Sequence, residues 1–306
     1  MSLYSIKSIM RYPTVKQLRY FLALSEAQHF GRAAADCFVS QSAFSNAIQE
    51  LESLLDAQLV DRTNRQVTIT AIGQEVAVQA RLVLRDIEML LEIAAEQKKP
   101  LTGDLRLGVI PTIAPFLLPP MLPKLRKAYP ELQLFLREDQ TARIHEQLMD
   151  GEIDLLLLAL PFELRGVETL SLYKDRFFLA AHEKTERINP ENYRPNRLAR
   201  GSVLLLKDGH CLRDHALAAC KLRDDEAVGR FAATSLLTLV EMVDADLGIT
   251  FLPEMARGSA MLRNTRVKMY SLDEKSYRTI GLAWRKGSAR VDEFKLLGEF
   301  LKEHRP

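Results

Sequence analysis

Two cysteines lie nine residues apart in the second half of the chain, and the first has a setting that could support thiol chemistry. Cys211 follows the turn-forming pair Asp208-Gly209, and the segment from Leu212 to Ala219 has a helical composition. Cys211 is therefore predicted to lie at a helix start, flanked by His210 and Arg213. Positive charge and a helix N-terminus both favour the thiolate, which is the nucleophilic form of cysteine. The sequence thus predicts a reactive thiol.

The second cysteine, Cys220, admits more than one interpretation. It lies beside three alanines and could be a small apolar residue on a helix. With His210, Cys211 and His215 it would also offer four nitrogen and sulfur ligands, although the close ligand pairs of common zinc sites are missing. The third cysteine, Cys37, is in register with apolar residues of its own predicted helix and is expected to be a core residue.

Composition indicates a globular protein of two or three domains. The chain has 306 residues, of which 47% are hydrophobic and 27% charged. No run approaches the roughly 20 apolar residues of a membrane span, and the first thirteen residues lack the apolar core of a secretory signal. We therefore expect a cytoplasmic protein without a membrane partner, in which three cysteines are too few for a disulfide framework. The net charge of +2 neither suggests nor excludes nucleic acid.

The N-terminal part has the pattern of a winged helix-turn-helix. Apolar residues recur at helical spacing from Val15 onward, and Val39-Ser40-Gln41 interrupts them before a second helix over 42–55. A turn-rich segment with a β-branched end follows at 60–70 and predicts a small hairpin, the wing. The predicted DNA-binding domain spans 13–70.

A long linker helix is predicted over residues 71–99. The segment is rich in Leu and Glu, contains no proline before Pro100, and has a broad apolar stripe. A helix this long between two compact regions is typical of dimerisation. The alternative is a core helix of the following domain. After Pro100 and Gly103 the pattern changes to alternating strands and helices, which indicates an α/β sheet.

Several motifs in residues 15–70 occur together, and the stretch resembles the DNA-binding domain of the LysR family of transcription regulators. The motifs are Leu18-Arg19-Tyr20-Phe21, His29-Phe30-Gly31-Arg32-Ala33-Ala34, Val39-Ser40-Gln41, and Asp61-Arg62 with Gly73. Ser42 and Phe44 depart from the usual family residues at the start of the recognition helix, which bears on the operator sequence and not on the fold.

The resemblance implies which residues contact double-stranded promoter DNA. Helices of this kind place their N-terminal residues at base edges in the major groove, and the polar residues there are Ser40, Gln41, Ser42, Ser45 and Asn46. Arg32, Arg62 and Arg65 are candidates for phosphate contacts, which position the protein without specifying sequence.

The regulatory half resembles the OxyR branch of the family, whose members sense hydrogen peroxide. The motifs that carry this are Gly108 to Pro115, Asp208 to Asp214 with a second cysteine nine residues after the first, Ala233 to Leu236, Gly248 to Thr250, and Thr279 to Gly281. The resemblance implies an α/β periplasmic-binding-protein-like regulatory domain over 104–306. Its two subdomains would be I, about 104–174 and 278–306, and II, about 175–277.

The same resemblance implies the chemistry. Hydrogen peroxide would oxidise Cys211, and Cys220 would resolve the product to a disulfide. The peroxide pocket would contain Thr112, whose hydroxyl orients peroxide, with Asp214 holding Arg213 or a water. Thr141 and His210 would complete the pocket.

The cysteine spacing then predicts a structural change. If residues 211–220 are helical, nine rises of about 1.5 Å separate the two Cα atoms by about 13 Å. A disulfide tolerates no more than about 7 Å. The bond therefore requires this segment to unwind, so oxidation would act as a switch.

The resemblance also implies partners, and two rival functions stay open. We expect a homo-oligomer, a tetramer built as a dimer of dimers, together with RNA polymerase and a thiol reductant of the glutaredoxin or thioredoxin kind; no cofactor is expected. One rival is a LysR regulator that senses a metabolite in the cleft between its subdomains. Another is a thiol peroxidase, for which a DNA-binding domain has no obvious use.

Overall fold

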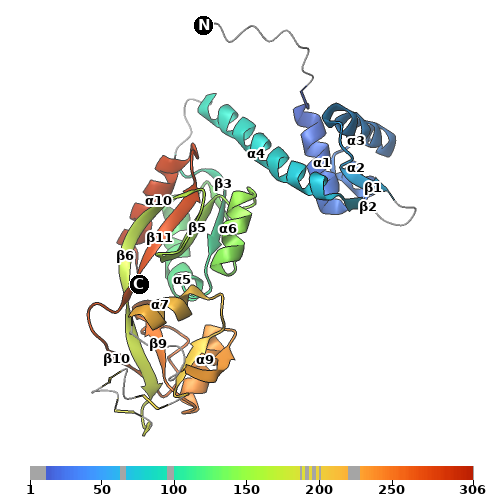
Figure 1. Cartoon of the computed structure of the whole chain (residues 1–306). Coiled ribbons are helices and arrows are strands. Elements are labelled where there is room, and N and C mark those ends of the chain that lie inside the picture. Colours follow the sequence, from blue (N-terminus) through green and yellow to red (C-terminus); the bar gives the residue numbers. More distant parts are fainter. Residues whose placement is uncertain are drawn as a thin grey trace, which may run out of the picture. The chain divides into compact units, whose positions relative to one another are not determined.

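The computed structural model describes residues 12–62, 67–94, 100–186, 188–189, 193–194, 198–199, 201–219 and 228–305. The chain divides into two compact units, residues 1–98 and 99–306, and each unit has its own hydrophobic core (Figure 1). Within these residues, no helix combines the length and apolar character needed to cross a membrane.

The N-terminal unit is the expected winged helix-turn-helix. Its helices are α1 (Val15–Ala27), α2 (Phe30–Asp36) and α3 (Gln41–Leu55), followed by the antiparallel strands β1 (Val60–Arg62) and β2 (Val67–Ile69). A capping box starts α1, because the Thr14 and Gln17 side chains each accept a hydrogen bond from the other residue's backbone N–H. Phe21, Phe44 and Ile48 are fully buried where the three helices meet.

The linker helix α4 (Ala71–Ala94) continues from the wing. Residues 95–99, the last part of the predicted linker, lie outside the described residues. Ala77 and Ala80 are buried in the core of the N-terminal unit, and α4 packs against α1. The alternative of a core helix of the following domain is therefore wrong, since α4 contributes to the core of the preceding one.

The regulatory unit is built on a mixed sheet of seven strands among the described residues. Six of them lie in the spatial order β10 (Val267–Ser271), β6 (Val167–His182), β11 (Tyr277–Arg285), β5 (Leu155–Leu160), β3 (Gly103–Val109), β4 (Leu132–Glu138). β3 is parallel to β4 and β5, whereas β11 is antiparallel to β5 and β6. Three helices accompany this part, α5 (Ala114–Ala128), α6 (Thr141–Met149) and α10 (Val291–Glu303).

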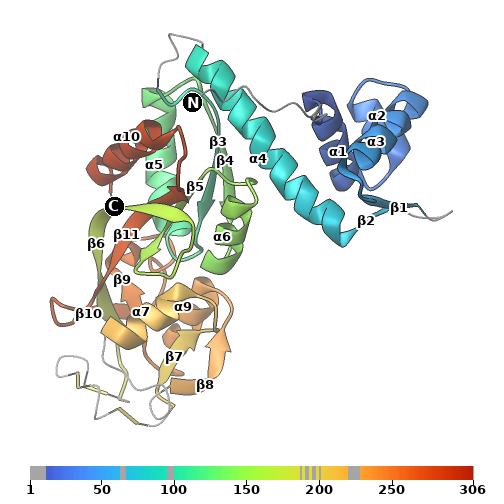
Figure 2. The ribbon, with the colours of Figure 1, turned by 45° about the horizontal axis from the view of Figure 1, so that its top comes forward.

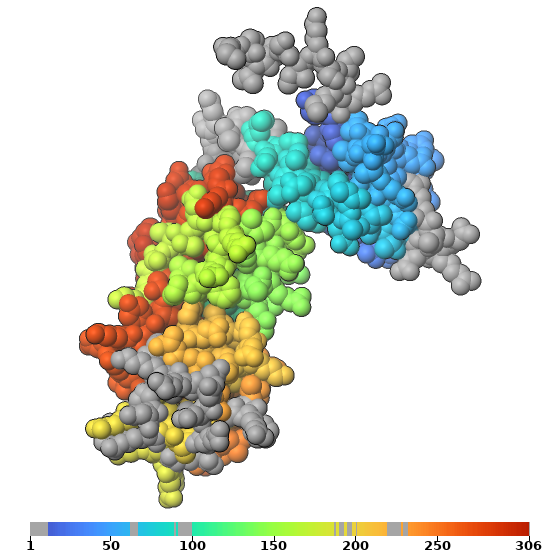
Figure 3. Space-filling view, viewed as in Figure 1, coloured from blue at the N-terminus to red at the C-terminus, as the bar shows by residue number. Residues whose placement is uncertain are grey.

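A second lobe carries the remaining elements (Figure 2). They are β7 (Val203–Leu206), α7 (Cys211–Ala219), β8 (Val228–Ala233), α9 (Leu236–Asp244), β9 (Thr250–Pro253) and the 3₁₀ turn η3 (Glu254–Ala256). β7 and β8 form a separate parallel pair. In Figure 3 the gold surface that includes α7 adjoins the green surface of the first lobe, and α7 packs against β11.

One long strand connects the two lobes. β6 pairs with β11 over residues 167–176 and then with β9 and β10 over 177–182. The two-lobed α/β fold was expected from the family resemblance. The predicted subdomain boundaries at 174/175 and 277/278 fall on β6 and at the start of β11, and these numbers stay predictions.

Candidate functional site

The exposed face of α3 carries the residues predicted to contact bases. Gln41, Ser42 and Asn46 are exposed, and Ser45 is half-buried. Ser40 lies just before the helix, where its hydroxyl accepts the backbone N–H three residues later at 3.3 Å. Ser40 thus has a structural task in addition to any contact with DNA.

The predicted phosphate contacts are placed only in part. Arg32 is exposed on α2, and its Nη2 donates to the carbonyl oxygen of Ala27 at 2.9 Å. Arg62 ends β1, with its backbone alone described. Arg65 lies outside the described residues.

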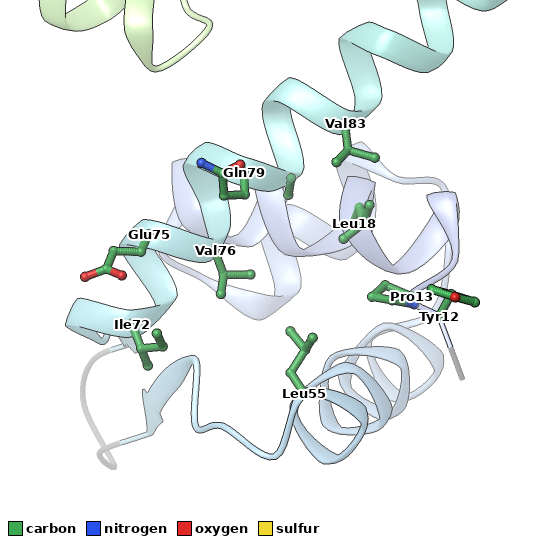
Figure 4. Close-up of a pocket in the computed structure, with 10 residues that line it drawn as sticks. Tyr12, Pro13, Leu18, Leu55, Ile72, Glu75, Val76, Gln79 and Val83 are labelled. Atoms are coloured by element: carbon green, nitrogen blue, oxygen red, sulfur yellow. The ribbon is translucent and has the colours of Figure 1, made fainter. Parts of the chain in front are cut away.

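An apolar pocket of about 500 Å³ opens in the N-terminal unit (Figure 4). It lies between α4 and the neighbouring ends of α1 and α3. Its lining is almost entirely apolar and consists of Tyr12, Pro13, Leu18, Leu55, Ile72, Glu75, Val76, Gln79, Ala80 and Val83. Ile72 and Val83 are more than two-fifths exposed, so α4 presents apolar side chains to solvent along this groove.

The predicted redox cysteine is the first residue of α7. Cys211 is buried and is not in a disulfide. Gly209 precedes it with φ +92°, a conformation that favours glycine, and a Cβ there would lie 2.8 Å from the Gln140 Oε1 atom. This turn brings the start of α7 against the start of α6, and the predicted helix start at Cys211 is confirmed.

Two buried threonines from the first lobe belong to this site. Thr141 is the first residue of α6, and the nearness of its hydroxyl to the thiol lowers the pKa of Cys211. This hydroxyl makes no hydrogen bond of good geometry among the described residues. Thr112 lies in the turn between β3 and α5 and is also buried.

The cation of this site is Arg278, which the sequence analysis did not identify. Its side chain on β11 is fully buried. Nη1 donates to Thr112 Oγ1 and Nη2 to the Thr112 carbonyl oxygen, both at 2.9 Å. Nε donates to Asp175 Oδ2, also at 2.9 Å. The sequence around it gave no local signal, because Arg278 lies near the start of β11, between Tyr277 and Thr279.

The sequence setting of Cys211 favours the thiolate, and its burial in the structure opposes this form. Burial raises the pKa of Cys211, against the lowering effects of Arg278 and of the Thr141 hydroxyl, and Asp214 raises the pKa further. Burial also lowers the pKa of His210, which disfavours a positive charge beside the thiol. That Cys211 reacts as a thiolate stays a prediction.

The other predicted pocket residues are placed around α7. Arg213 Nε pairs with Asp208 Oδ1 at 3.0 Å, whereas the expected role of Asp214 was to hold Arg213 or a water. Asp214 is exposed and acts on the thiol only through its charge. These positions show that Asp208 helps to hold the turn before α7.

His215 is a further buried acceptor that was not predicted for the peroxide pocket. Its Nε2 lies 2.9 Å from the Pro161 carbonyl oxygen, so this nitrogen must carry the proton and Nδ1 is left as an acceptor. Nδ1 is buried without a partner among the described residues. Burial lowers the pKa of His215, and Arg278 lowers it further.

Cys220, the predicted resolving cysteine, lies outside the described residues. The helix that begins at Cys211 is described as far as Ala219, and eight helical rises of about 1.5 Å separate these two Cα atoms by about 12 Å. The predicted separation of the two cysteines stays a prediction.

The described residues give no support to a metal site at His210, Cys211, His215 and Cys220. In the described stretches, no group of three or more His, Cys, Asp or Glu side chains could hold a metal ion. Cys220, one of the four proposed ligands, lies outside the described residues.

The chain matches two families of known sequence. Residues 15–74 match the bacterial regulatory helix-turn-helix proteins of the lysR family. Residues 98–306 match the LysR substrate binding domain. The second match spans the whole regulatory unit, and the first spans the larger part of the N-terminal unit.

Relatives and a solved structure agree with this. The HTH-type transcriptional regulator EstR of Acinetobacter baylyi is 41% identical over 95% of this chain and 96% of its own. The DNA-binding transcriptional dual regulator OxyR of Escherichia coli is 38% identical, with 94% of each chain covered. A full-length OxyR variant from Pseudomonas aeruginosa superposes with a TM-score of 0.81 at 30% identity, covering 96% of both chains. The chain belongs to the LysR family of bacterial helix-turn-helix transcription regulators.

Proposed function

We propose that this regulator responds to hydrogen peroxide through Cys211. The observation that carries the proposal is a buried thiol beside a buried guanidinium and two threonine hydroxyls, in a site with no other evident task. Relatives that include the Escherichia coli and Haemophilus influenzae proteins are named hydrogen peroxide-inducible genes activators. A Corynebacterium glutamicum OxyR variant with the same fold is described as H2O2-bound.

The hydrogen-bond polarity of the site suits peroxide. Arg278 can only donate, so Thr112 Oγ1 must accept from it. The Thr112 hydroxyl proton then points to another acceptor. With Thr141, the site offers two hydroxyl donors and one cation around the sulfur. Such donors stabilise a thiolate and the hydroxide that leaves when the O–O bond breaks.

The proposed oxidation balances without a cofactor. The Cys211 sulfur attacks one peroxide oxygen, the O–O bond breaks, and the sulfur becomes a sulfenic acid. The thiol proton ends on the departing oxygen, which leaves as water. The Cys220 thiol then attacks the sulfenic sulfur, and a second water leaves as the disulfide forms.

The second step requires a change in α7. Because α7 is helical from Cys211 to Ala219, and two cysteines nine residues apart on a helix are too far apart for a disulfide, we propose that the bond forms only if part of this helix unwinds. α7 packs against β7 and β11, so its unwinding removes contacts in both lobes. We propose this rearrangement as the signal that alters activation or repression of antioxidant genes.

The proposed DNA contacts are those of α3 and the wing. Gln41, Ser42, Ser45 and Asn46 would face bases in the major groove, while Arg32 and the wing arginines would contact phosphates. The unit's own fold presents α3 with its polar face exposed, as such a contact requires.

The groove beside α4 supports a homo-oligomer. We propose that the apolar groove (Figure 4) is covered by a second copy of the chain, because its apolar lining continues along α4 to Leu90, which is 64% exposed. In the regulatory unit, Leu136 on the edge strand β4 and Leu237 on α9 are also exposed. A second apolar surface is what a dimer of dimers needs, and we propose a tetramer.

The remaining partners are proposed from the mechanism. A disulfide switch needs a thiol reductant to reset it, and an activator needs RNA polymerase. Both would be met in the cytoplasm, where we propose that the protein acts. We further propose that it is a sensor which reacts once and not a peroxidase with sustained turnover.

Peptide mapping of the full chain tests the proposal. One equivalent of hydrogen peroxide should yield a peptide pair that links Cys211 and Cys220, and Cys211→Ser should abolish it. Cys37→Ser is the matched control and should leave the yield unchanged. If no linked peptide forms and Cys211 stays reduced, the proposal is wrong. A promoter response that survives in Cys211→Ser would indicate a regulator of the metabolite-sensing kind.

A further inference from the structure

The arginine beside the thiol is itself paired with a buried carboxylate. Asp175 lies on β6, and its side chain is as inaccessible as that of Arg278. Its Oδ2 accepts from Arg278 Nε at 2.9 Å, and its Oδ1 accepts the backbone N–H of Met255 at 3.2 Å. Both carboxylate oxygens are therefore engaged, one by the cation and one by the second lobe.

The guanidinium does not depend on Asp175 for its position. Its Nη1 donates a hydrogen bond to the Thr112 hydroxyl oxygen, and its Nη2 donates one to the Thr112 carbonyl oxygen, each at 2.9 Å. These two bonds hold the end of the side chain that carries most of its N–H donors. Removal of the Asp175 charge should therefore leave the guanidinium close to its present place.

Charge then decides what Asp175 does to the thiol. The ionisable groups that act on Cys211 are Arg278 from β11, which favours the thiolate, and Asp214 from α7, which opposes it. Asp175 cancels much of the Arg278 charge, because the two groups are in contact and both are out of water. His215 shares this environment but is neutral. Within this buried ion pair the positive charge of Arg278 is offset, so it favours the thiolate less than an unpaired arginine would.

We propose that Asp175 restrains Cys211 by offsetting the charge of Arg278, and so sets the peroxide concentration at which the sensor responds. The inference rests on the proposed function. Asp175 makes the thiol less reactive than the arginine alone would allow. A regulator that must ignore basal peroxide gains a threshold from such an arrangement.

Asp175→Asn in the full chain tests the inference, because it removes the charge and keeps the size. Alkylation of Cys211 by iodoacetamide should reach half its maximal rate at a lower pH than in the parent chain. At pH 7 the peroxide rate constant should rise about threefold. This figure assumes that the thiolate population rises about tenfold. A thiolate with a lower pKa is intrinsically less nucleophilic, and this offsets part of the gain. An unchanged or slower reaction, with an unshifted pH profile, would overturn the inference.

Two further variants keep the test decisive. Asp154→Asn removes another largely buried carboxylate, one that lies 4.0 Å from Arg290, and should change neither rate. Asp175→Ser also removes the charge and retains an acceptor for the Met255 N–H, so it replaces Asp175→Asn if that variant does not fold. It should shift the alkylation profile in the same direction.

The two readouts separate this inference from the proposed function. If Cys211 of the parent chain is alkylated but does not react with peroxide, the proposed function fails. The alkylation profile of Asp175→Asn still tests the restraint by Asp175. If peroxide oxidises the parent chain and Asp175→Asn reacts no faster, only the restraint is wrong.

Discussion

The DNA-contacting helix and the redox site carry out their chemistry with opposite architectures. On α3 the polar residues follow one another along the chain, and most of them face solvent. At the redox site, Thr112, Cys211 and Arg278 come from three distant segments and are all buried. The first surface is a property of one helix, whereas the second exists only when both lobes are assembled.

This difference predicts which properties a substitution in each region should change. A substitution on the exposed face of α3 alters what the helix contacts and little else. A substitution at the buried site alters hydrogen bonds and charge balance in two lobes at once. The two regions belong to separate compact units, so each function should be removable without the other.

The largest expected effect is the loss of peroxide oxidation without loss of DNA binding, and the reverse. Cys211→Ser should abolish oxidation by peroxide and leave the affinity of the reduced protein for promoter DNA unchanged. The pair Gln41→Ala and Asn46→Ala should lower DNA affinity by at least tenfold, since each lost base contact costs about 1–3 kcal/mol. Peroxide titration of thiols and DNA binding at fixed salt measure the two. Loss of DNA binding in reduced Cys211→Ser would show that the two functions are not separable.

Arg278→Gln should slow peroxide oxidation of Cys211 by about tenfold or more, because it removes the cation that favours the thiolate. It should also lower the free energy of unfolding by about 3–5 kcal/mol, since it leaves the Asp175 carboxylate buried without its partner. Stopped-flow oxidation and denaturant unfolding measure the two effects.

The matched control is Arg137→Gln, which breaks an exposed ion pair. The Arg137 and Glu152 side chains are 56% and 38% exposed, at a distance of 3.3 Å. Surface pairs contribute at most about 1 kcal/mol, and the oxidation rate should not change. Equal effects of the two variants would show that the buried arginine has no special part in the chemistry.

A smaller effect is expected at the start of α3. Ser40→Ala removes the cap of the recognition helix and should lower the free energy of unfolding of the N-terminal unit by about 1 kcal/mol. Asn46→Ala, on the exposed face of the same helix, is the control for stability. Thermal unfolding with a probe in this unit measures both, and equal melting temperatures would refute the capping role.

The smallest effect concerns pH. Burial lowers the pKa of His210 and of His215, so the folded state binds fewer protons than the unfolded chain below about pH 6.5. Stability should therefore fall as pH drops through that range. Denaturant unfolding between pH 7 and pH 5 should show a shallower fall for His215→Gln than for the parent chain. Parallel curves would contradict this.

Local sequence patterns predicted much of the fold and one of the two sites. The helical period and the cap at Ser40 were sufficient for α3, because a helix and its exposed face are set by neighbouring residues. The turn at Gly209 likewise predicted the start of α7. Arg278 and Asp175 could not be found this way. They meet across 103 residues of sequence, and nothing local distinguishes a buried ion pair from two charges on the surface.

The effect of burial on Cys211 was missed for the same reason. Its neighbours in sequence suggested a positive setting, whereas burial has the largest effect on the pKa of the thiol and raises it. His210 is neutral because the same burial acts on it. Adjacent residues indicate which groups are present, while the tertiary structure decides which of them are charged.

The central claim is that peroxide joins Cys211 to Cys220 and that α7 must unwind for this bond to form. Hydrogen exchange of the amides of 211–219, before and after one equivalent of peroxide, tests it most directly. The account predicts strong loss of protection in this segment in the oxidised parent chain. Protection should be retained in Cys220→Ser treated in the same way. A linked Cys211–Cys220 peptide with α7 still fully protected would contradict the account.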